Sequence, residues 1–180
     1  MRTDIKMIAA VGKNWEIGYE NELLFHLKKD MAFFREKTIG NTVVMGRKTL
    51  ESFPGGRPLP ERNNIVLTRR EDQALIKQYE KGNPPMFFHS METVLEFVSA
   101  LRGEVYVIGG GQVYREFLPF VSEAFITKVD CEKKADTWFP DLDAIPGWQQ
   151  VSASETYYEN ETGFCFVHYR HTPDSGNAVF

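Results

Sequence analysis

Three consecutive glycines, Gly109, Gly110 and Gly111, restrict the fold of this chain more than any other feature. The apolar residues 105–108 before them are typical of a buried strand, and residues 112–118 after them have a helical pattern. Because glycine lacks Cβ, the backbone can take φ > 0 and a ligand can come close enough to accept its N–H groups. A helix that begins directly after the turn adds free N–H donors and the positive end of its dipole. The segment predicts a strand, a turn and a helix that bind phosphate, the alternative being a tight turn without a ligand.

The rest of the chain alternates short apolar runs with helical patterns. The predicted strands are residues 5–11, 42–45, 64–67, 86–88, 105–108 and 124–129. The predicted helices are residues 27–37, 48–53, 91–101 and 112–118. This alternation predicts an α/β fold with a mostly parallel, doubly wound sheet and helices on both faces, because parallel neighbours need a crossover. Ligands on such a sheet gather at the carboxyl ends of the strands.

The last part of the chain departs from this alternation. Residues 149–158 and 164–170 predict an antiparallel C-terminal hairpin with a five-residue loop at 159–163. We expect the least structure in residues 69–85 and in the tail from Thr172. Residues 11–25 are expected to form a long loop of the kind that serves as an active-site lid.

Composition excludes several classes of protein. A chain of 180 residues with 42% apolar content predicts one domain over residues 1–180. A net charge of −4 argues against a nucleic-acid-binding surface. We expect a cytoplasmic protein, because no apolar run is long enough for a signal peptide or a membrane span. Cys131 and Cys165 have neither a disulfide nor a metal-ligand spacing, so we expect no metal and interpret both as structural.

Cationic side chains follow a second predicted strand. Residues 42–45 are followed by Gly46, Arg47, Lys48 and Thr49, which begin a helix. A guanidinium, an ammonium and a hydroxyl beside free backbone donors suit a diphosphate.

A third strand end repeats this pattern. Residues 64–67 are followed by Thr68, Arg69 and Arg70, a cluster that would select an additional phosphate on a ribose. Lys and Arg at strand ends are also common as solvated surface charges. Three such ends in one α/β chain favour a phosphorylated dinucleotide as the ligand.

The catalytic candidate lies in the first predicted helix. At about 100° per residue, Leu27, Met31 and Phe34 share one face, and Asp30 falls at its edge, near Phe33. A desolvated, unpaired carboxylate there has a raised pKa and can hold a cationic heterocycle by two hydrogen bonds. The alternative is a helix-edge Asp that points into water.

Taken together, these segments resemble the dihydrofolate reductase family from Met7 to Arg170. The shared segments are residues 8–10, Ile17, Gly18, Leu27, Asp30, Phe34, 45–47, Thr49, 57–60, Arg62, 107–111, Tyr114, Thr127 and the sequence DTWFP at 136–140. The resemblance implies a dihydrofolate reductase-like fold and the NADPH-dependent reduction of 7,8-dihydrofolate to tetrahydrofolate. In that reaction, hydride passes from nicotinamide C4 to pterin C6 and a proton reaches N5.

The resemblance also implies roles for individual residues. Asp30 is expected to bond to the pterin amino group and N3 with support from Thr127, and Phe25 and Leu23 of the lid complete the catalytic set. Arg62 is expected to pair with the α-carboxylate of the glutamate tail. The other implied substrate contacts are Ile8, Ala10, Leu27, Phe34, Phe53, Leu59, Ile108 and Tyr114. The implied cofactor contacts are Ala10, Ile17, Gly18, Gly46, Arg47, Lys48, Thr49, Leu67, Thr68, Arg69, Gly109, Gly110, Gly111, Gln112, Val113 and Tyr114.

Further expectations come with the family: a cis peptide bond between Gly109 and Gly110, antifolates as inhibitors, and a monomer. One departure from the family's pattern lies next to the expected pterin site. Leu24-Phe25 stands where the family usually has Pro-Trp, so an indole N–H is absent there. Trp15 is not at the equivalent place, although we consider that it packs over the site, and His26 is interpreted as a surface or capping residue. Residues 54–56 are expected to lengthen the rim of the substrate cleft.

Three alternatives remain open at this stage. The first is another reductase on the same fold, such as one acting on a ribosylated pyrimidine, against which Asp30 and Arg62 argue. The second is a non-catalytic NADPH-binding module, and the third is a nucleic-acid binder, which the acidic balance disfavours.

Overall fold

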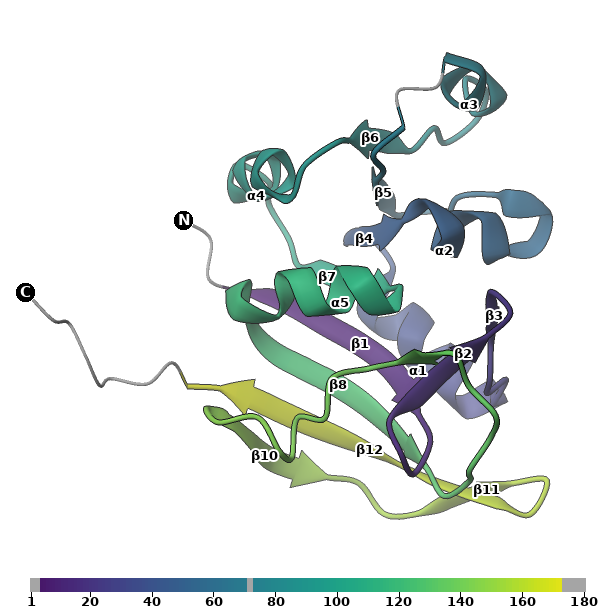
Figure 1. Cartoon of the computed structure of the whole chain (residues 1–180), viewed down its shortest axis with the longest axis vertical. Coiled ribbons are helices and arrows are strands. Elements are labelled where there is room, and N and C mark those ends of the chain that lie inside the picture. The colour runs from purple at the N-terminus through teal and green to yellow at the C-terminus, as the bar shows by residue number, and fades with distance from the viewer. Residues whose placement is uncertain (1–3, 71–72, 173–180) are drawn as a thin grey trace, which may run out of the picture.

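The computed structural model describes residues 4–70 and 73–172. Its helices are α1 (Lys28–Thr38), α2 (Arg47–Ser52), α3 (Gln73–Gln78), α4 (Met91–Ser99) and α5 (Gly111–Phe117), with short 3₁₀ turns at Pro54–Gly56 and Leu118–Phe120. The strands of the main sheet are β1 (Ile5–Val11), β4 (Thr42–Gly46), β5 (Asn63–Leu67), β6 (Met86–Phe88), β7 (Val105–Gly109), β8 (Val121–Val129), β10 (Trp148–Ala153), β11 (Tyr157–Glu159) and β12 (Thr162–His171). A smaller sheet contains β2 (Glu16–Tyr19), β3 (Glu22–Leu23) and β9 (Thr137–Trp138). Figure 1 shows how these elements are arranged.

The main sheet is mostly parallel, as predicted. Its order is β10-β12-β8-β1-β7-β4-β5-β6, and β11 pairs with β12. The strands from β8 to β6 are parallel to their neighbours, whereas β12 runs antiparallel to β8 and β10. The central strands are rich in β-branched residues and are almost wholly buried, which is typical of parallel strands covered on both faces.

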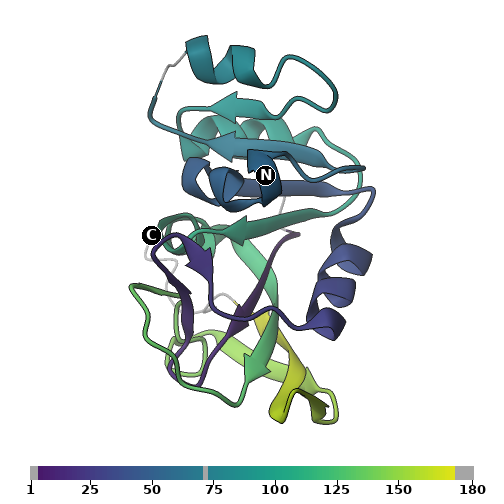
Figure 2. The same cartoon turned by 90° about the vertical axis from the view of Figure 1, so that its right-hand side faces the viewer.

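Helices cover both faces of this sheet, with α5 on one face and α1 on the other (Figures 1 and 2). The two faces follow from the alternation of side chains along a strand. On β8, Ala124 and Ile126 belong to the main apolar core with Phe117 of α5. Phe125, between them in sequence, instead makes an edge contact with Phe33 of α1, with ring centroids 6.4 Å apart. Strand β8 therefore connects the core to the helix that carries the catalytic candidate.

Two predictions about irregular segments were wrong. The expected loop at 11–25 contains β2 and β3, joined by a two-residue turn in which Glu20 and Asn21 have φ of 48° and 61°. The expected unstructured region at 69–85 contains α3. Short strands and a helix of six residues gain most of their stability from tertiary packing, so their local sequence signal is weak.

The C-terminal hairpin is present, but its loop is shorter than predicted. Tyr157–Glu159 pairs with β12, and the turn consists of Asn160 and Glu161, with φ of 49° and 64°. Two residues with φ > 0 match the right-handed twist of the flanking strands. The five-residue loop was therefore wrong. Of the predicted irregular tail, only Thr172 is among the described residues.

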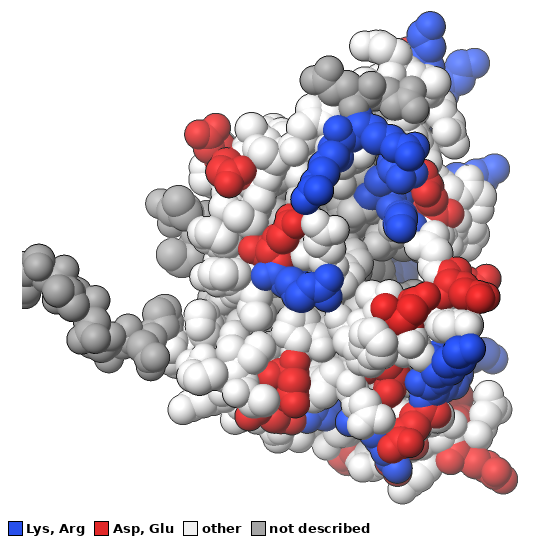
Figure 3. All heavy atoms as spheres, viewed as in Figure 1, with Lys and Arg blue, Asp and Glu red and all other residues white. Residues whose placement is uncertain are grey.

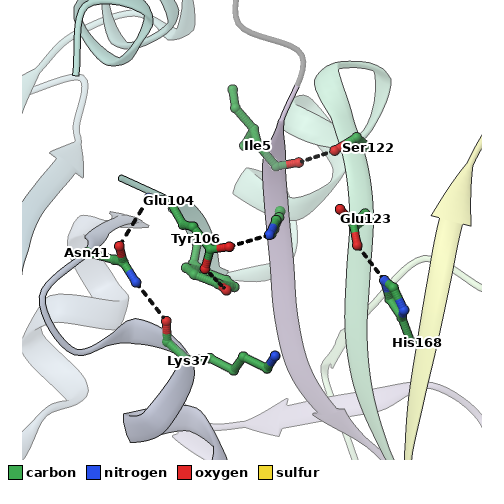
Figure 4. Close-up of polar contacts among 9 residues, drawn as sticks. Ile5, Lys37, Asn41, Glu104, Tyr106, Ser122, Glu123 and His168 are labelled. Atoms are coloured by element: carbon green, nitrogen blue, oxygen red, sulfur yellow. Dashed lines mark hydrogen bonds and ion pairs between the residues drawn. The ribbon is translucent and has the colours of Figure 1, made fainter. Parts of the chain in front are cut away.

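A polar cluster lies beside the amino-terminal ends of the central strands. Lys6 on β1 forms an ion pair with Glu104, with 2.6 Å between Nζ and Oε1. Tyr106 donates a hydrogen bond to the same carboxylate (Figure 4). These two partners hold the pKa of Glu104 below its usual range. The cluster pins β1 to β7 at the end of the sheet away from the ligand-binding edge.

Both cysteines, Cys131 and Cys165, are free and half-buried. No helix within residues 4–70 and 73–172 combines the length and apolar character needed to cross a membrane.

Candidate active site

A large cavity opens at the carboxyl ends of the parallel strands, where the fold predicts a ligand. It is lined by the ends of β1, β4, β5 and β7, by the first turns of α2 and α5, by one side of α1, and by β2 and β3. Its volume is about 1540 Å³. A site for a single drug-sized ligand measures roughly 300–1,000 Å³, so this cavity has room for two ligands side by side.

Asp30 supplies the acidic group of the cavity. It lies in the first turn of α1, and its Oδ1 accepts a hydrogen bond of 2.5 Å from Thr127 Oγ1 on β8. Burial raises the pKa of Asp30, and the Thr127 hydrogen bond opposes this by stabilising the charged form. The prediction of a half-buried carboxylate among apolar side chains is confirmed, and the alternative of an Asp that points into water is wrong.

Tyr114 closes the cavity behind Asp30. Its hydroxyl donates a hydrogen bond of 2.8 Å to the carbonyl of Ile8, and its side chain is 3% exposed. Burial, and to a smaller extent the charge of Asp30, raise the pKa of Tyr114 above its ordinary value. The phenol therefore stays neutral and acts as a hydrogen-bond donor.

Arg62 adds a cation to the wall of the cavity. It is 8% exposed, and its Nε atom is buried without a hydrogen-bond partner among the described residues. Its guanidinium carbon lies 5.9 Å from the ring centroid of Phe34 on α1. Burial, together with the nearby positive charge of Arg35, lowers the pKa of Arg62. A buried guanidinium with an unused donor is suited to an anionic ligand.

The glycine segment forms an open backbone surface beside these groups. The Gly109–Gly110 peptide bond is cis, as expected, and α5 begins at Gly111. A Cβ on Gly46 would lie 3.2 Å from Val113 Cγ2, and one on Gly110 would lie 3.4 Å from Thr49 Oγ1. A side chain at Gly46 would crowd Val113, and one at Gly110 would contact Thr49, so glycine keeps the backbone accessible at this wall of the cavity.

Cations surround this backbone surface. Arg47 forms an ion pair with Glu51 one turn further along α2, and Lys48 is exposed at the cavity wall. Thr68 is buried and Arg69 is exposed after β5. Lys and Arg side chains gather around α2 on this face of the molecule (Figure 3). The three strand ends that the sequence singled out thus meet at one edge of the sheet.

The segment at 16–25 covers one side of the cavity, and a second segment fastens it. Asp136 accepts a hydrogen bond of 2.9 Å from the Glu20 N–H through Oδ2, and its own N–H donates to the carbonyl of Gly18. The hydrogen bond from the Glu20 N–H, followed by one from the Thr137 hydroxyl, holds the pKa of Asp136 below its usual range. Leu23, at the edge of the cavity, is 63% exposed, whereas Phe25 is 8% exposed.

The structure brings most of the predicted site residues together. Those that line the cavity are Ile8, Ala10, Ile17, Gly18, Leu23, Phe25, Asp30, Phe34, Gly46, Arg47, Lys48, Thr49, Phe53, Leu59, Arg62, Leu67, Thr68, Arg69, Ile108, Gly109, Gly110, Gly111, Gln112, Val113 and Tyr114.

Two predicted residues do not line the cavity. Thr127 lies behind Asp30 and reaches the site through its hydrogen bond. Leu27 was predicted as a substrate contact, but it packs instead in an apolar cluster with Phe25 and Phe164. The expectation that Trp15 covers the site was also wrong, because Trp15 is buried in the main core.

Other cavity-lining residues were not predicted as site residues. They are Ala9, Tyr19, Asn21, Glu22, His26, Met31, Ala32, Arg35, Ser52, Pro54, His89, Ser90, Met91, Glu92, Arg115, Glu116, Asp136, Thr137 and Trp138. Residues 89–92 carried a usable signal, since they follow β6 and Ser90 caps α4 by accepting a hydrogen bond from the Thr93 N–H. His26 is exposed, as expected, although it also lies at the cavity edge.

Comparison with known proteins agrees with this geometry. A family model described as dihydrofolate reductase matches residues 4–171. The dihydrofolate reductase of Neisseria meningitidis serogroup A is 34% identical over 166 residues, which cover 92% of this chain and 96% of the relative. That of Bacillus subtilis is 37% identical over 151 residues, covering 84% and 83% of the two chains.

A solved structure is similar over nearly the same length. The dihydrofolate reductase from Enterococcus faecalis, complexed with NADP(H) and RAB-propyl, superposes with a TM-score of 0.81 and 30% sequence identity. The match covers 94% of this chain and 96% of that one. Since both the sequence and the fold match over almost the whole length, the chain belongs to the dihydrofolate reductase family.

Proposed function

We propose that the cavity binds dihydrofolate with its pterin ring against Asp30, and binds NADPH along the strand ends at Gly46, Thr68 and Gly110. The observation that carries this proposal is the half-buried carboxylate of Asp30, held by Thr127 and facing a cavity with room for two ligands. NADPH supplies the hydride, from nicotinamide C4 to pterin C6, and protonation at N5 completes tetrahydrofolate.

Asp30 orients the pterin ring. A carboxylate has two oxygens, and Thr127 donates to Oδ1. The carboxylate can still accept from the pterin amino group and from N3–H, which fixes the ring in its plane. Because its pKa is raised, Asp30 holds a proton closer to neutral pH than an exposed Asp does.

Arg62 and the aromatic side chains bind the rest of the substrate. The unpartnered Nε and the terminal guanidinium nitrogens of Arg62 are suited to the α-carboxylate of the glutamate tail. Phe34 and Phe53 line the same cavity as Arg62 and Asp30, and a flat ring system would pack against them. Leu23 and Phe25 exclude water from the reacting carbon, and antifolates are proposed to occupy the same space as dihydrofolate.

The cofactor side fits a dinucleotide that carries an extra phosphate. Gly110 and Gly46 leave the backbone open where a side chain would fill the phosphate space, and Thr49 Oγ1 lies beside Gly110. Arg69 and Thr68 are proposed to contact the 2′-phosphate. The cytoplasmic location, the monomeric state and the single-domain organisation are part of the same proposal.

The test is the loss of NADPH absorbance when dihydrofolate is added, repeated with NADH. Asp30→Asn keeps the size of the side chain and removes its charge, so hydride transfer should fall by on the order of 10²–10⁴ while NADPH binding stays within about twofold. Turnover of dihydrofolate by the Asn variant at a rate near that of the wild type at neutral pH would remove Asp30 from this role.

A further inference from the structure

A lysine outside the cavity holds the part of the lid that carries Phe25. Lys133 Nζ donates a hydrogen bond of 2.7 Å to the carbonyl of Leu24, the peptide group that joins Leu24 to Phe25. The same ammonium lies 5.1 Å from the ring centroid of Phe25. Phe25 itself lines the cavity and is almost buried. One cation therefore contacts both the backbone and the ring of a cavity-wall residue.

Both backbone polar groups of Leu24 are hydrogen-bonded. Its N–H donates to the carbonyl of Ile17 at 3.2 Å, and Ile17 lines the cavity. Its carbonyl accepts from Lys133. With both backbone groups engaged, the direction in which the chain enters Phe25 is restrained, although Phe25 has no polar side-chain atom of its own to hold it.

Lys133 lies in the segment that directly follows β8, the strand that also supports Asp30. Thr127 of β8 bonds to Asp30, and β8 ends two residues later at Val129. The Cys131 N–H then donates to the carbonyl of Val129 at 2.8 Å, which ties the start of the 130–136 segment to the strand. Asp30 and Phe25, which both line the cavity, are thus held by β8 and by the segment that follows it.

We propose that Lys133 is a positioning residue, which fixes Phe25 relative to Asp30 and thereby sets the geometry for hydride transfer. The proposal rests on the proposed function, because it takes the space between Phe25 and Asp30 to be the pterin site. It also accounts for how this chain keeps an ordered wall with Leu24-Phe25 at this place. The contacts are a charge-assisted hydrogen bond and a cation–π interaction, which a freely solvated lysine would not make.

A nearby lysine provides a matched control. Lys13 Nζ lies 3.2 Å from Asp130 Oδ1, and both side chains are more than half exposed. This pair lies beside the same segment, since the Lys13 N–H donates to the carbonyl of Cys131, but Lys13 does not line the cavity. Exposed ion pairs of this kind contribute little to stability.

The experiment compares Lys133→Met, Lys133→Arg and Lys13→Met with the wild type. In Lys133→Met we expect hydrogen exchange in the peptide spanning residues 19–27 to accelerate about three- to tenfold, with no change in residues 42–50. Single-turnover hydride transfer should slow about three- to tenfold, and NADPH affinity should change less than twofold. Lys133→Arg keeps a donor and a cation and should recover most of both losses, whereas Lys13→Met should match the wild type throughout.

The exchange measurement does not depend on turnover, so the two proposals can fail separately. Unchanged exchange of the 19–27 peptide in Lys133→Met overturns the positioning role whether or not the enzyme reduces dihydrofolate. Faster exchange with hydride transfer within twofold of the wild type also overturns it, as does an arginine variant no better than the methionine variant. Absence of NADPH consumption by the wild type overturns the proposed function instead.

Discussion

Thr127→Val should make the carboxyl group of Asp30 harder to ionise. The substitution replaces the hydroxyl with a methyl group of similar size at a side chain that is 1% exposed, so it removes one hydrogen bond with little change in packing. Two opposing effects act on the pKa of Asp30: burial raises it, and the Thr127 hydrogen bond lowers it. Removing the second effect leaves burial unopposed, so the pKa of Asp30 must rise further.

The size of the change in the pKa of Asp30 follows from the strength of the lost hydrogen bond. A hydrogen bond to a charged group contributes about 1.5–3 kcal/mol, and about 1.4 kcal/mol corresponds to a tenfold change in proton affinity. The proton affinity of Asp30 should therefore increase on the order of ten- to a hundredfold. The pH at which hydride transfer begins to fall should move upward with it, because both depend on the protonation state of the same carboxyl group.

The assay is a titration of the carboxyl carbon of Asp30 by ¹³C NMR in the ligand-free protein, assigned with Asp30→Asn. Thr127→Ser is the control, since it keeps the hydroxyl and loses only the methyl group. The reasoning is refuted if Asp30 titrates at the same pH in the Val and Ser variants, or at a lower pH in the Val variant.

Three further predictions concern stability and selectivity. Burial raises the pKa of Asp30 in the folded state, so its contribution to stability is full below about pH 3.9, the usual value for Asp, and is lost as pH rises through the folded-state pKa. Asp30→Asn should accordingly raise the melting temperature at neutral pH, with the gain shrinking in acid; a lower melting temperature at pH 7 contradicts this. Tyr114→Phe leaves the Ile8 carbonyl without its 2.8 Å hydrogen bond and should lower the free energy of unfolding by about 1–3 kcal/mol in urea titrations, a loss below about 0.5 kcal/mol counting against it. Arg69→Glu should weaken NADPH binding about ten- to a hundredfold and NADH binding less than threefold; if discrimination survives, Arg47 is the better candidate.

Much of the site was predictable because it lies where strands end. The runs before Gly46, Thr68 and Gly109 are buried strands, and buried parallel strands leave a local signal of apolar, β-branched residues. Their carboxyl ends share one edge of the sheet, so the residues after them had to meet there. Helix periodicity places Asp30 at the edge of an apolar face, and the resemblance to the family implies its role as the acid.

Other contacts had no local signal. Leu27 was predicted to touch substrate but turns into a cluster with Phe25 and Phe164, and Phe164 lies more than 130 residues away in the chain. Asp136 and Lys133 hold the 16–25 segment by hydrogen bonds between residues that are more than 100 positions apart in the sequence. No pattern within a short window of sequence encodes such a pair.

The sequence by itself determined the order of most strands and helices along the chain, and it predicted a phosphate-binding edge and Asp30 as the candidate acid, because periodicity, glycine and charge act over a few neighbouring residues. Tertiary structure alone decided how far burial raises the pKa of Asp30, which donor on β8 opposes that effect, and which distant side chain holds Phe25 in the wall. These properties depend on desolvation and on pairs of groups that only folding brings together.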